Sequence, residues 1–342
     1  MPHVILTGAS GFVGSHTLRH LLTETDWTIA CPVSFRHKGV PERITVAMQD
    51  HPEWWDRVNI VRHDLAAPIG KITFKSLGGD RCDYVLNLAS QSHVDRSIAH
   101  PAPFIYNNVG VVVEIFDAAR RMDNLKAFVQ VSTDEVYGPA PAGHNHTEWE
   151  PILPSNPYAA SKAAQEAIAI SYWRTFGVPL IITNTMNIIG ETQDSEKFIP
   201  MTIKAALSGE PMTIHASPDG QIGSRFYLHA RNQADALLFL LRTLGEGGRL
   251  TWRPEISRPH RYHVVGEREV DNLQMAVMVA DFAGCDLKYQ TIDFHSSRPG
   301  HDLRYALDGS RIEALGWKAP VPLEESLRRT VEWTLAHPEW LS

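Results

Sequence analysis

Two neighbouring carboxylates follow an apolar run in the segment "VSTDEVYG", residues 131–138. The run before them, "KAFVQ", has the composition of a buried strand. Asp134 and Glu135 must therefore either face solvent or take part in chemistry. If their surroundings separate their pKa values, one can act as a general base and the other as a general acid. Neighbouring residues of extended chain point in different directions, so the pair could serve two adjacent atoms of one substrate.

A tyrosine and a lysine stand four residues apart in "PYAASKAA". On a helix, Tyr158 and Lys162 would share one face. An ammonium near a phenol favours the phenolate and lowers the tyrosine pKa, which suits a base that removes a proton from a sugar alcohol. Such a pair alone is common on helix surfaces. Together with the glycine-rich N-terminus and Thr133 at the end of the preceding strand, it predicts an oxidation site.

Three glycines, Gly8, Gly11 and Gly14, lie between an N-terminal apolar strand and a helix in "LTGASGFVGSH". Glycine permits a tight turn, lets the backbone approach a pyrophosphate and allows the helix to pack closely on the strand. The helix N-terminus, here with Phe12 and Val13, offers free N–H groups to phosphate oxygens. The spacing is G-x-x-G-x-x-G, and its place between strand and helix predicts a dinucleotide site.

The residues after the second predicted strand bear on which dinucleotide binds. "CPVSFRHKG" lacks the acid that would grip the ribose hydroxyls; Ser34 stands there instead, and Arg36 follows. A missing acid beside cations fits the 2′-phosphate of NADP, but the cations could equally belong to a solvated loop. The sequence therefore leaves NAD and NADP open. Further predicted cofactor contacts, at the ends of predicted strands, are Asp64, Leu65, Ala89, Ser90 and Ser132.

Short apolar runs alternate with helical segments over the first half of the chain. Strands are predicted at residues 3–8, 27–33, 58–65, 82–90, 127–133 and 179–188, with helices that include 107–122 and 157–177. This alternation predicts an α/β fold with a Rossmann-type doubly wound parallel sheet, covered on both faces. Residues 1–186, with part of 225–262 returning, are predicted to form the dinucleotide-binding domain. Residues 187–342 are predicted to form mainly a smaller mixed α/β domain that binds the substrate.

The composition narrows the class of protein. The chain has 342 residues, 43% of them hydrophobic and 21% charged, which is typical of a globular protein. A formal net charge of −7 argues against nucleic acid or an anionic membrane as a partner. Three separated cysteines predict no disulfide framework, and no signal peptide or membrane span is predicted, so we expect a cytoplasmic protein. The "HNH" at 144–146 has no accompanying cysteine or aspartate ligands, and no metal is expected.

These motifs resemble those of the extended short-chain dehydrogenase/reductase family, and more narrowly its nucleotide-sugar 4,6-dehydratases, especially those that act on dTDP-glucose. The resemblance spans nearly the whole chain. "TGASGFVGSH" and "NPYAASKA" mark the broad family, whereas "SHVDRSI" and the acid pair in "STDEVYG" are closer to the dehydratase branch. Other similar segments are "EKFIP", "RPGHDLRYALD" and "LGWKA".

The resemblance implies an activity. Family members oxidise C4 of a nucleotide-bound hexose of the dTDP- or UDP-glucose type, eliminate water across C5 and C6, and return the hydride to C6. They keep a tightly bound NAD(P) that is regenerated each turnover. By motif match, Thr133 bonds the C4 hydroxyl, Tyr158 is the base for the oxidation of C4 and Lys162 its partner, Glu135 takes the C5 proton and Asp134 protonates the departing hydroxyl. The substrate-binding residues implied in the same way are His93, Asn187, Lys197, Arg225, Arg298 and His301.

Departures from the family pattern leave alternatives open. "NIIGE" stands where relatives have "NNYGP", and His263 stands where they often have Asn. These changes lie on the nucleotide side and leave the base open. A nucleotide-sugar 4-epimerase would share the glycine loop, Thr133, Tyr158 and Lys162 but needs no acid pair. A 5,6-dehydratase would make an exocyclic enol ether in place of a ketone, and a sensing protein would have lost its catalytic pairs. A homodimer that pairs through two long helices is a further implication of the resemblance.

Overall fold

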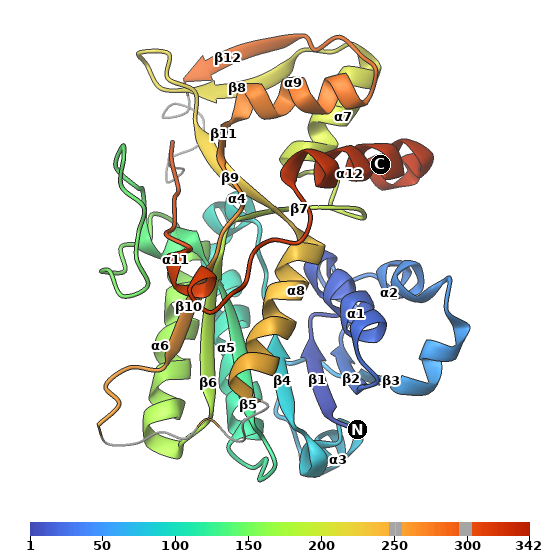
Figure 1. Cartoon of the computed structure of the whole chain (residues 1–342), viewed down its shortest axis with the longest axis vertical. Coiled ribbons are helices and arrows are strands. Elements are labelled where there is room, and N and C mark those ends of the chain that lie inside the picture. The colour runs from blue at the N-terminus through green and yellow to red at the C-terminus, as the bar shows by residue number, and fades with distance from the viewer. Residues whose placement is uncertain (246–249, 251–254, 294–302) are drawn as a thin grey trace.

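The centre of the protein is a seven-stranded parallel sheet in the order β10-β6-β5-β4-β1-β2-β3 (Figure 1). The computed structural model describes residues 1–245, 250, 255–293 and 303–342. The strands of the sheet are β1 (His3–Thr7), β2 (Thr28–Val33), β3 (Val58–Arg62), β4 (Tyr84–Asn87), β5 (Ala127–Thr133), β6 (Leu180–Thr185) and β10 (His260–Val264). The predicted α/β Rossmann-type doubly wound fold is confirmed.

The strand order reverses between β1 and β4, which pair directly although β2 and β3 intervene in the sequence. At such a point the loops that leave the two strands diverge, and a crevice opens beyond their carboxyl ends. Thr7 lies beside Asn87 in register, and its hydroxyl donates to Asn87 Oδ1 at 2.6 Å. The same hydroxyl accepts from the Leu88 and Ala89 amides, each at 3.0 Å. Thr7 therefore fixes the place where the loop after β4 begins.

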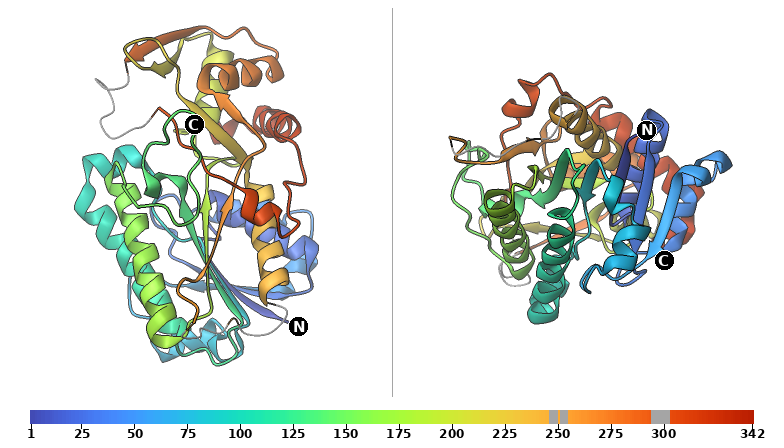
Figure 2. Two further views of the ribbon diagram at one scale, coloured as in Figure 1. Left: turned by 60° about the vertical axis from the view of Figure 1, so that its left-hand side comes forward. Right: turned by 90° about the horizontal axis from the view of Figure 1, so that it is seen from below.

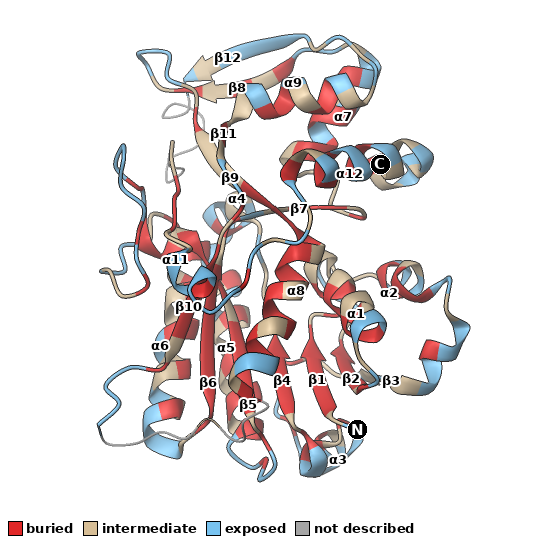
Figure 3. Ribbon diagram, in the orientation of Figure 1, coloured by how far each residue is buried: buried red, intermediate tan, exposed pale blue. Residues whose placement is uncertain are grey.

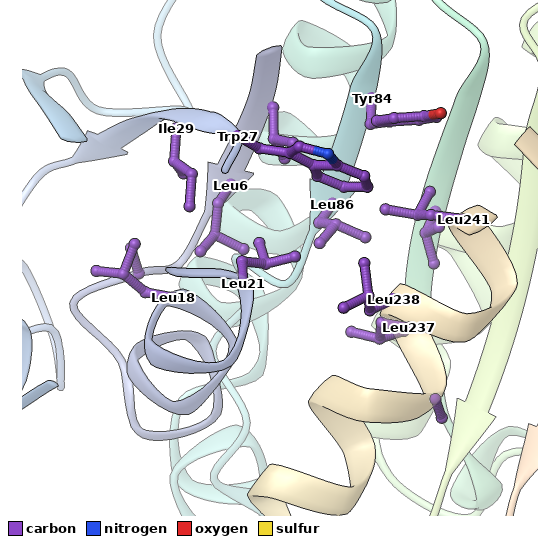
Figure 4. Close-up of a cluster of buried hydrophobic side chains, with 14 of the residues drawn as sticks. Leu6, Leu18, Leu21, Trp27, Ile29, Tyr84, Leu86, Leu237, Leu238 and Leu241 are labelled. Carbon is purple, nitrogen blue, oxygen red and sulfur yellow. The ribbon is translucent and has the colours of Figure 1, made fainter. Parts of the chain in front are cut away.

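Helices cover both faces of the sheet, and its strands are almost wholly buried except β3, which lies at one edge and is partly exposed (Figures 2 and 3). Leu6 points to one face, where it meets Leu21 and Leu237 (Figure 4). Its neighbour Ile5 points to the other face, in the cluster that contains Phe116. None of the helices in the described part of the chain combines the length and apolar character needed to span a bilayer. The covering helices are α1 (Phe12–Glu24), α2 (Pro41–Met48) and α8 (Ala230–Leu240) on the first face, and α3 (Lys71–Ser76), α5 (Pro101–Ala119) and α6 (Pro157–Phe176) on the second.

A smaller mixed unit lies beyond the carboxyl ends of the sheet, at the top of Figure 1. Its own apolar core includes Ile203, Tyr227, Val279 and Leu327. Its strands form two small sheets, β11-β9-β7 and β12-β8. Its elements are β7 (Asn187–Ile189), α7 (Phe198–Ser208), β8 (Met212–Ala216), β9 (Ser224–His229), β11 (Glu269–Asp271), α9 (Asn272–Phe282), β12 (Tyr289–Asp293) and α12 (Leu323–Ala336).

The prediction of a single strand over residues 179–188 is wrong. β6 ends at Thr185, and after Met186 the chain enters β7, which pairs with β9 in another sheet. The apolar pattern continues through Met186, so it could not show that the chain passes from one sheet to the next. Conversely, α8 and β10 come from the later part of the chain and complete the main sheet and its cover.

Candidate active site

The glycine loop at residues 8–14 turns tightly between β1 and α1. Gly8 has a φ of +74°, a left-handed conformation that glycine adopts without strain. A Cβ on Gly14 would lie 2.0 Å from the Gly8 carbonyl oxygen, so only glycine fits there. Gly11 is the N-cap of α1 and brings no side chain to cap it, which leaves the first amides of the helix for an anion. This cradle fits the pyrophosphate of a dinucleotide.

A cavity of about 420 Å³ extends from this loop along the carboxyl ends of the strands. It brings together motifs that are far apart in the sequence. The predicted cofactor residues that line it are Gly8, Gly11, Phe12, Val13, Gly14, Ser34, Arg36, Asp64, Leu65, Ala89, Ser90 and Ser132. The other predicted residues that line it are Thr133, Asp134, Glu135, Tyr158, Lys162, His93, Asn187 and Lys197.

The remaining predicted substrate residues are placed otherwise. Arg225 is not among the described residues that line the cavity, and its guanidinium lies 4.7 Å from the centre of the Tyr305 ring. Its charge still acts on Asp134 and Glu135, where it opposes a rise in the pKa of both. Two predicted residues lie outside the described part of the chain, Arg298 and His301.

The acid pair begins a one-turn 3-10 helix, η3 (Asp134–Tyr137), directly after β5. Asp134 Oδ1 accepts from the Thr133 hydroxyl at 2.8 Å and from the Glu135 amide at 3.0 Å. Its second oxygen, Oδ2, is buried and has no hydrogen-bond partner among the described residues. Glu135 Oε2 accepts from Asn156 Nδ2 at 2.9 Å. Asp134 is thus held through one oxygen, and the other is left without a partner among the described residues.

Burial raises the pKa of Asp134 to about 6 and that of Glu135 to about 7, with the Asp134 charge adding to the second rise. We expected the surroundings to split the pair into an ionised base, Glu135, and a protonated acid, Asp134. The structure instead raises both, and the expected base is the more readily protonated of the two. Near neutral pH both carboxyls are close to their titration midpoints, which suits proton transfer in either direction.

The predicted lowering of the Tyr158 pKa is contradicted. Tyr158 and Lys162 both lie on α6 and both line the cavity, but the Lys162 ammonium donates to the Val131 carbonyl at 2.7 Å. Burial raises the pKa of Tyr158, and the Glu135 charge raises it further, although a hydrogen bond with Thr133 opposes this. Burial lowers the pKa of Lys162 to about 8. The spacing could not show that a strand carbonyl competes for the ammonium.

The cations that follow β2 are paired with acids. Arg36 forms an ion pair with Asp64, and both line the cavity. Lys38 Nζ lies 3.3 Å from a Glu196 carboxylate oxygen and 3.9 Å from an Asp194 oxygen. Because the charge of Arg36 is already balanced by Asp64, it is a weaker partner for a 2′-phosphate than the sequence suggested.

Asn156 was not predicted to belong to the site, but it holds the site in two ways. Its Oδ1 caps α6 by accepting from the Ala159 amide at 2.9 Å, while its Nδ2 donates to Glu135. Pro157 occupies the first turn of the helix. An asparagine followed by proline at the start of a helical segment is the signal of such a cap, and it could have been found.

Two side-chain clusters among the described residues bear on metal binding, because their ligand atoms lie within 4.8 Å of one another: His16, Glu191 and His229, and His144, His146 and Glu150. In the first, His229 Nδ1 accepts from the Arg231 amide at 3.0 Å, which places the ring proton on Nε2, the atom that faces the carboxylate. In the second, Glu150 lies 3.0 and 2.6 Å from the two rings. The "HNH" segment therefore does have a carboxylate partner, which we overlooked. Hydrogen bonds join Glu150 to both rings of the second cluster, whereas in the first His229 Nε2 lies 3.0 Å from the Glu191 carboxylate without forming a hydrogen bond among the described residues.

The fold and the site define a dinucleotide-binding α/β protein with acid/base residues beside its cofactor cradle. The chain matches the NAD dependent epimerase/dehydratase family over residues 4–251, and it belongs to that family. It is 32% identical to dTDP-glucose 4,6-dehydratase 1 of Escherichia coli K12, over 99% of this chain and 94% of that protein.

Solved structures extend this comparison. A double mutant of the DesIV dTDP-glucose 4,6-dehydratase of Streptomyces venezuelae, with NAD bound, superimposes with a TM-score of 0.84 at 28% identity, over 99% of this chain and 98% of that one. The UDP-glucose 4-epimerase of Thermus thermophilus, also with NAD, gives a TM-score of 0.81 at 26% identity, over 97% and 98% of the two chains. The two activities share this fold.

The buried acids should make stability depend on pH. A carboxyl whose pKa is raised by folding binds its proton more tightly in the native state than in the unfolded chain. The free energy of unfolding is therefore highest below the pKa of the unfolded chain, and it falls as the pH rises towards the pKa of the folded protein. Glu135→Gln removes this effect. We expect its free energy of unfolding to match the parent near pH 4 and to exceed it by about 2–3 kcal/mol at pH 8, measured by urea titration.

Glu324→Gln provides the control for this measurement. A hydrogen bond from Arg268 lowers the pKa of Glu324, so the ionised Glu324 stabilises the native state at pH values above the pKa of the unfolded chain. Glu324→Gln should therefore lower the free energy of unfolding at pH 8, which is the opposite of the change expected for Glu135→Gln. The decrease should be smaller than that change because the Arg268–Glu324 pair is exposed. An equal response of the two variants to pH would show that burial of Glu135 is not the cause.

Proposed function

We propose that the protein is a nucleotide-sugar 4,6-dehydratase, which converts an NDP-hexose of the dTDP- or UDP-glucose type to the NDP-4-keto-6-deoxyhexose. The observation that carries the proposal is the position of Asp134 and Glu135. They line the same cavity as Tyr158 and the glycine loop, Asp134 is buried and Glu135 half-buried, and their pKa values are raised to about 6 and 7. A 4-epimerase needs the oxidation residues but has no use for two acids that titrate near neutral pH.

Oxidation at C4 is assigned to Thr133, Tyr158 and Lys162. The Thr133 hydroxyl bonds the C4 hydroxyl, and Tyr158 takes its proton. NAD, when bound, supplies the ring that accepts the hydride from C4 and returns it to C6. The proximity of Lys162 Nζ to the cavity, at the Val131 carbonyl, suits a second role in holding the ribose next to that ring. Because burial raises the pKa of Tyr158, the phenolate that takes this proton needs a positive charge beside it, which the oxidised nicotinamide of NAD would supply when bound.

Elimination is assigned to the acid pair. A ketone at C4 acidifies the proton on C5, and the Glu135 carboxylate removes it. The electrons form the C5–C6 double bond as the C6–O bond breaks, and Asp134 gives its proton to the departing oxygen, which leaves as water. The uncommitted oxygen of Asp134, Oδ2, is the atom free to carry that proton, because Oδ1 already accepts from Thr133 and the Glu135 amide.

Binding of the nucleotide diphosphate is assigned to His93, Asn187, Lys197, Arg225, Arg298 and His301. Lys197 supports this best, because it lines the cavity as a half-buried cation at the N-cap of α7. Burial lowers its pKa, so an added diphosphate would regain the favourable charge interaction that burial removes. For the dinucleotide we propose NAD, since Arg36 is engaged by Asp64, and relatives of this fold were solved with NAD.

The arrangement of the whole chain is proposed on the same basis. Residues 1–186, with part of 225–262, would bind the dinucleotide, and 187–342 would mainly bind the nucleotide sugar. We propose a homodimer in which α5 and α6, which pack against each other, pair with the same helices of a second copy (Figure 2). Tyr106 on α5 and Phe176 at the end of α6, 75% and 49% exposed, support an apolar contact there. We place the protein in the cytoplasm.

The first test is the product formed from dTDP-glucose or UDP-glucose. A 4-keto-6-deoxy product, seen by its alkali-induced absorbance and by NMR, is the expected result, and the better substrate identifies the base. A C4 epimer formed without loss of water would favour the epimerase alternative instead. An exocyclic enol ether in the NMR spectrum would point to a 5,6-dehydratase.

The second test is the mass of whatever nucleotide the purified protein releases on denaturation. We expect NAD in the parent. Gly14→Ala should carry none, because its Cβ would collide with the Gly8 carbonyl and deform the cradle. Gly143→Ala is the control, since nothing within 4 Å would meet its Cβ, although its positive φ adds some strain. NADP in the parent would contradict the proposed cofactor.

The third test separates the two half-reactions. Glu135→Gln should still oxidise C4, seen as transient absorbance of the reduced nicotinamide, but should lose about 100-fold or more in elimination because the C5 base is gone. Tyr158→Phe should fail earlier, before any reduced cofactor appears. Product formation by Glu135→Gln at the parent rate would remove Glu135 from the role assigned here.

A further inference from the structure

A buried polar network lies against the segment that carries the acids. Its members are Tyr137, Glu166, Asn184, Arg261 and His263, each at most 2% exposed, and none of them is among the described residues that line the cavity. They come from η3, α6, β6 and β10, and the last two strands pair at one edge of the main sheet (Figure 1). Polar and charged groups are costly to bury, so this arrangement needs an explanation.

One arm of the network holds the start of the segment. Asn184 Nδ2 donates to the Thr133 carbonyl at 3.0 Å and to Glu166 Oε1 at 2.8 Å. Glu166 Oε2 accepts from Arg261 in a short ion pair. The charge of Glu166 also raises the pKa of Lys162, one helical turn away, against the lowering by burial. The carbonyl that precedes the acid pair is therefore tied to a buried charge.

The other arm holds the end of the segment. Arg261 Nη1 donates to Tyr137 Oη at 3.2 Å and to the Glu148 carbonyl at 2.9 Å. His263 Nδ1 donates to the Asp308 carbonyl at 3.1 Å, which leaves Nε2 to accept from the Tyr137 hydroxyl at 2.9 Å. Burial and the Arg261 charge lower the pKa of His263 to about 3, so the ring stays neutral in this tautomer.

Stability alone does not account for this network. A buried ion pair replaced by well-packed apolar side chains often leaves a protein equally or more stable. Arg261 Nε and Asn184 Oδ1 also lack a hydrogen-bond partner among the described residues, so the network is incompletely satisfied. What it does supply is two fixed points, the Thr133 carbonyl and the Tyr137 hydroxyl, on either side of the acids.

We propose that Tyr137, Glu166, Asn184, Arg261 and His263 are positioning residues that clamp both ends of residues 133–137 and so aim the acid pair at C5 and C6. The inference rests on the proposed dehydratase function, and it gives these residues no contact with the substrate. Loosening the clamp should slow elimination far more than it weakens binding, because a displacement of about 1 Å can cost about 100-fold in rate.

Tyr137→Phe tests the clamp directly, since it removes only the hydroxyl that contacts Arg261, His263 and the Glu148 carbonyl. We expect the rate of elimination to fall about 10- to 100-fold with KM within about 2-fold of the parent. Amide hydrogen exchange of a peptide that spans 133–137 should become faster in the same variant. Tyr84→Phe is the matched control, because Tyr84 is equally buried, at 2% exposure, in the core beside Trp27. It begins β4 and so lies at the end of the sheet opposite the carboxyl ends that form the site. The Tyr84→Phe variant should change neither readout.

A second variant, Glu166→Met with Arg261→Met, separates positioning from stability. Removing both charges together should keep the free energy of unfolding near the parent value, since neither charge is left unpaired. The clamp predicts slow elimination and fast exchange at 133–137 in this stable variant as well. Elimination at the parent rate, or unchanged exchange in both variants, would overturn the proposal. If the parent itself forms no 4-keto-6-deoxy product, the proposed function fails, while the exchange comparison still decides whether the network holds the segment.

Discussion

The desolvation of two adjacent carboxylates is the constraint around which the site is arranged. Taking an ionised carboxylate out of water costs several kcal/mol unless partners compensate. At Asp134 and Glu135 the close partners are neutral donors, the Thr133 hydroxyl and the Asn156 amide. A close ion pair would stabilise the ionised forms and lower the pKa values far below 7. Neutral donors hold the acids in place and still let them exchange protons near neutral pH.

The parallel sheet decides which groups these acids meet. All seven strands point the same way, so the loops that carry chemistry collect at one edge. β5, which ends in the acid segment, is two strand spacings from β1 and its glycine loop, a separation of about 10 Å. The helix that follows β5 in the chain, α6, returns across the same edge and brings Tyr158 against Thr133. A dinucleotide laid along this edge would therefore have its pyrophosphate at one end and the acids at the other.

The parts that could be predicted from the sequence are those set by local geometry. The glycine spacing follows from a turn in which Gly14 has no room for a Cβ, and the i, i+4 spacing put Tyr158 and Lys162 on one helix face. The predictions that failed depend on contacts between segments that are distant in the sequence. Lys162 meets a carbonyl of β5, Arg36 meets Asp64, and the apolar run through Met186 divides between two sheets. None of these partners can be read from spacing, because the fold brings them together.

The overall fold cannot separate the two activities found among its relatives, since a dehydratase and an epimerase superimpose on it with TM-scores of 0.84 and 0.81. The distinction between the two activities has to come from the residues of η3, one turn of 3-10 helix. In an epimerase, two buried acids at this place would cost stability without serving the reaction, and a neutral residue at either position would remove that cost. Here both acids are present, Asp134 buried and Glu135 half-buried, and they are held by a hydroxyl, an amide and a capping asparagine that leave them able to titrate. A dehydration explains this combination, because it removes a proton from one carbon and gives a proton to the oxygen that leaves.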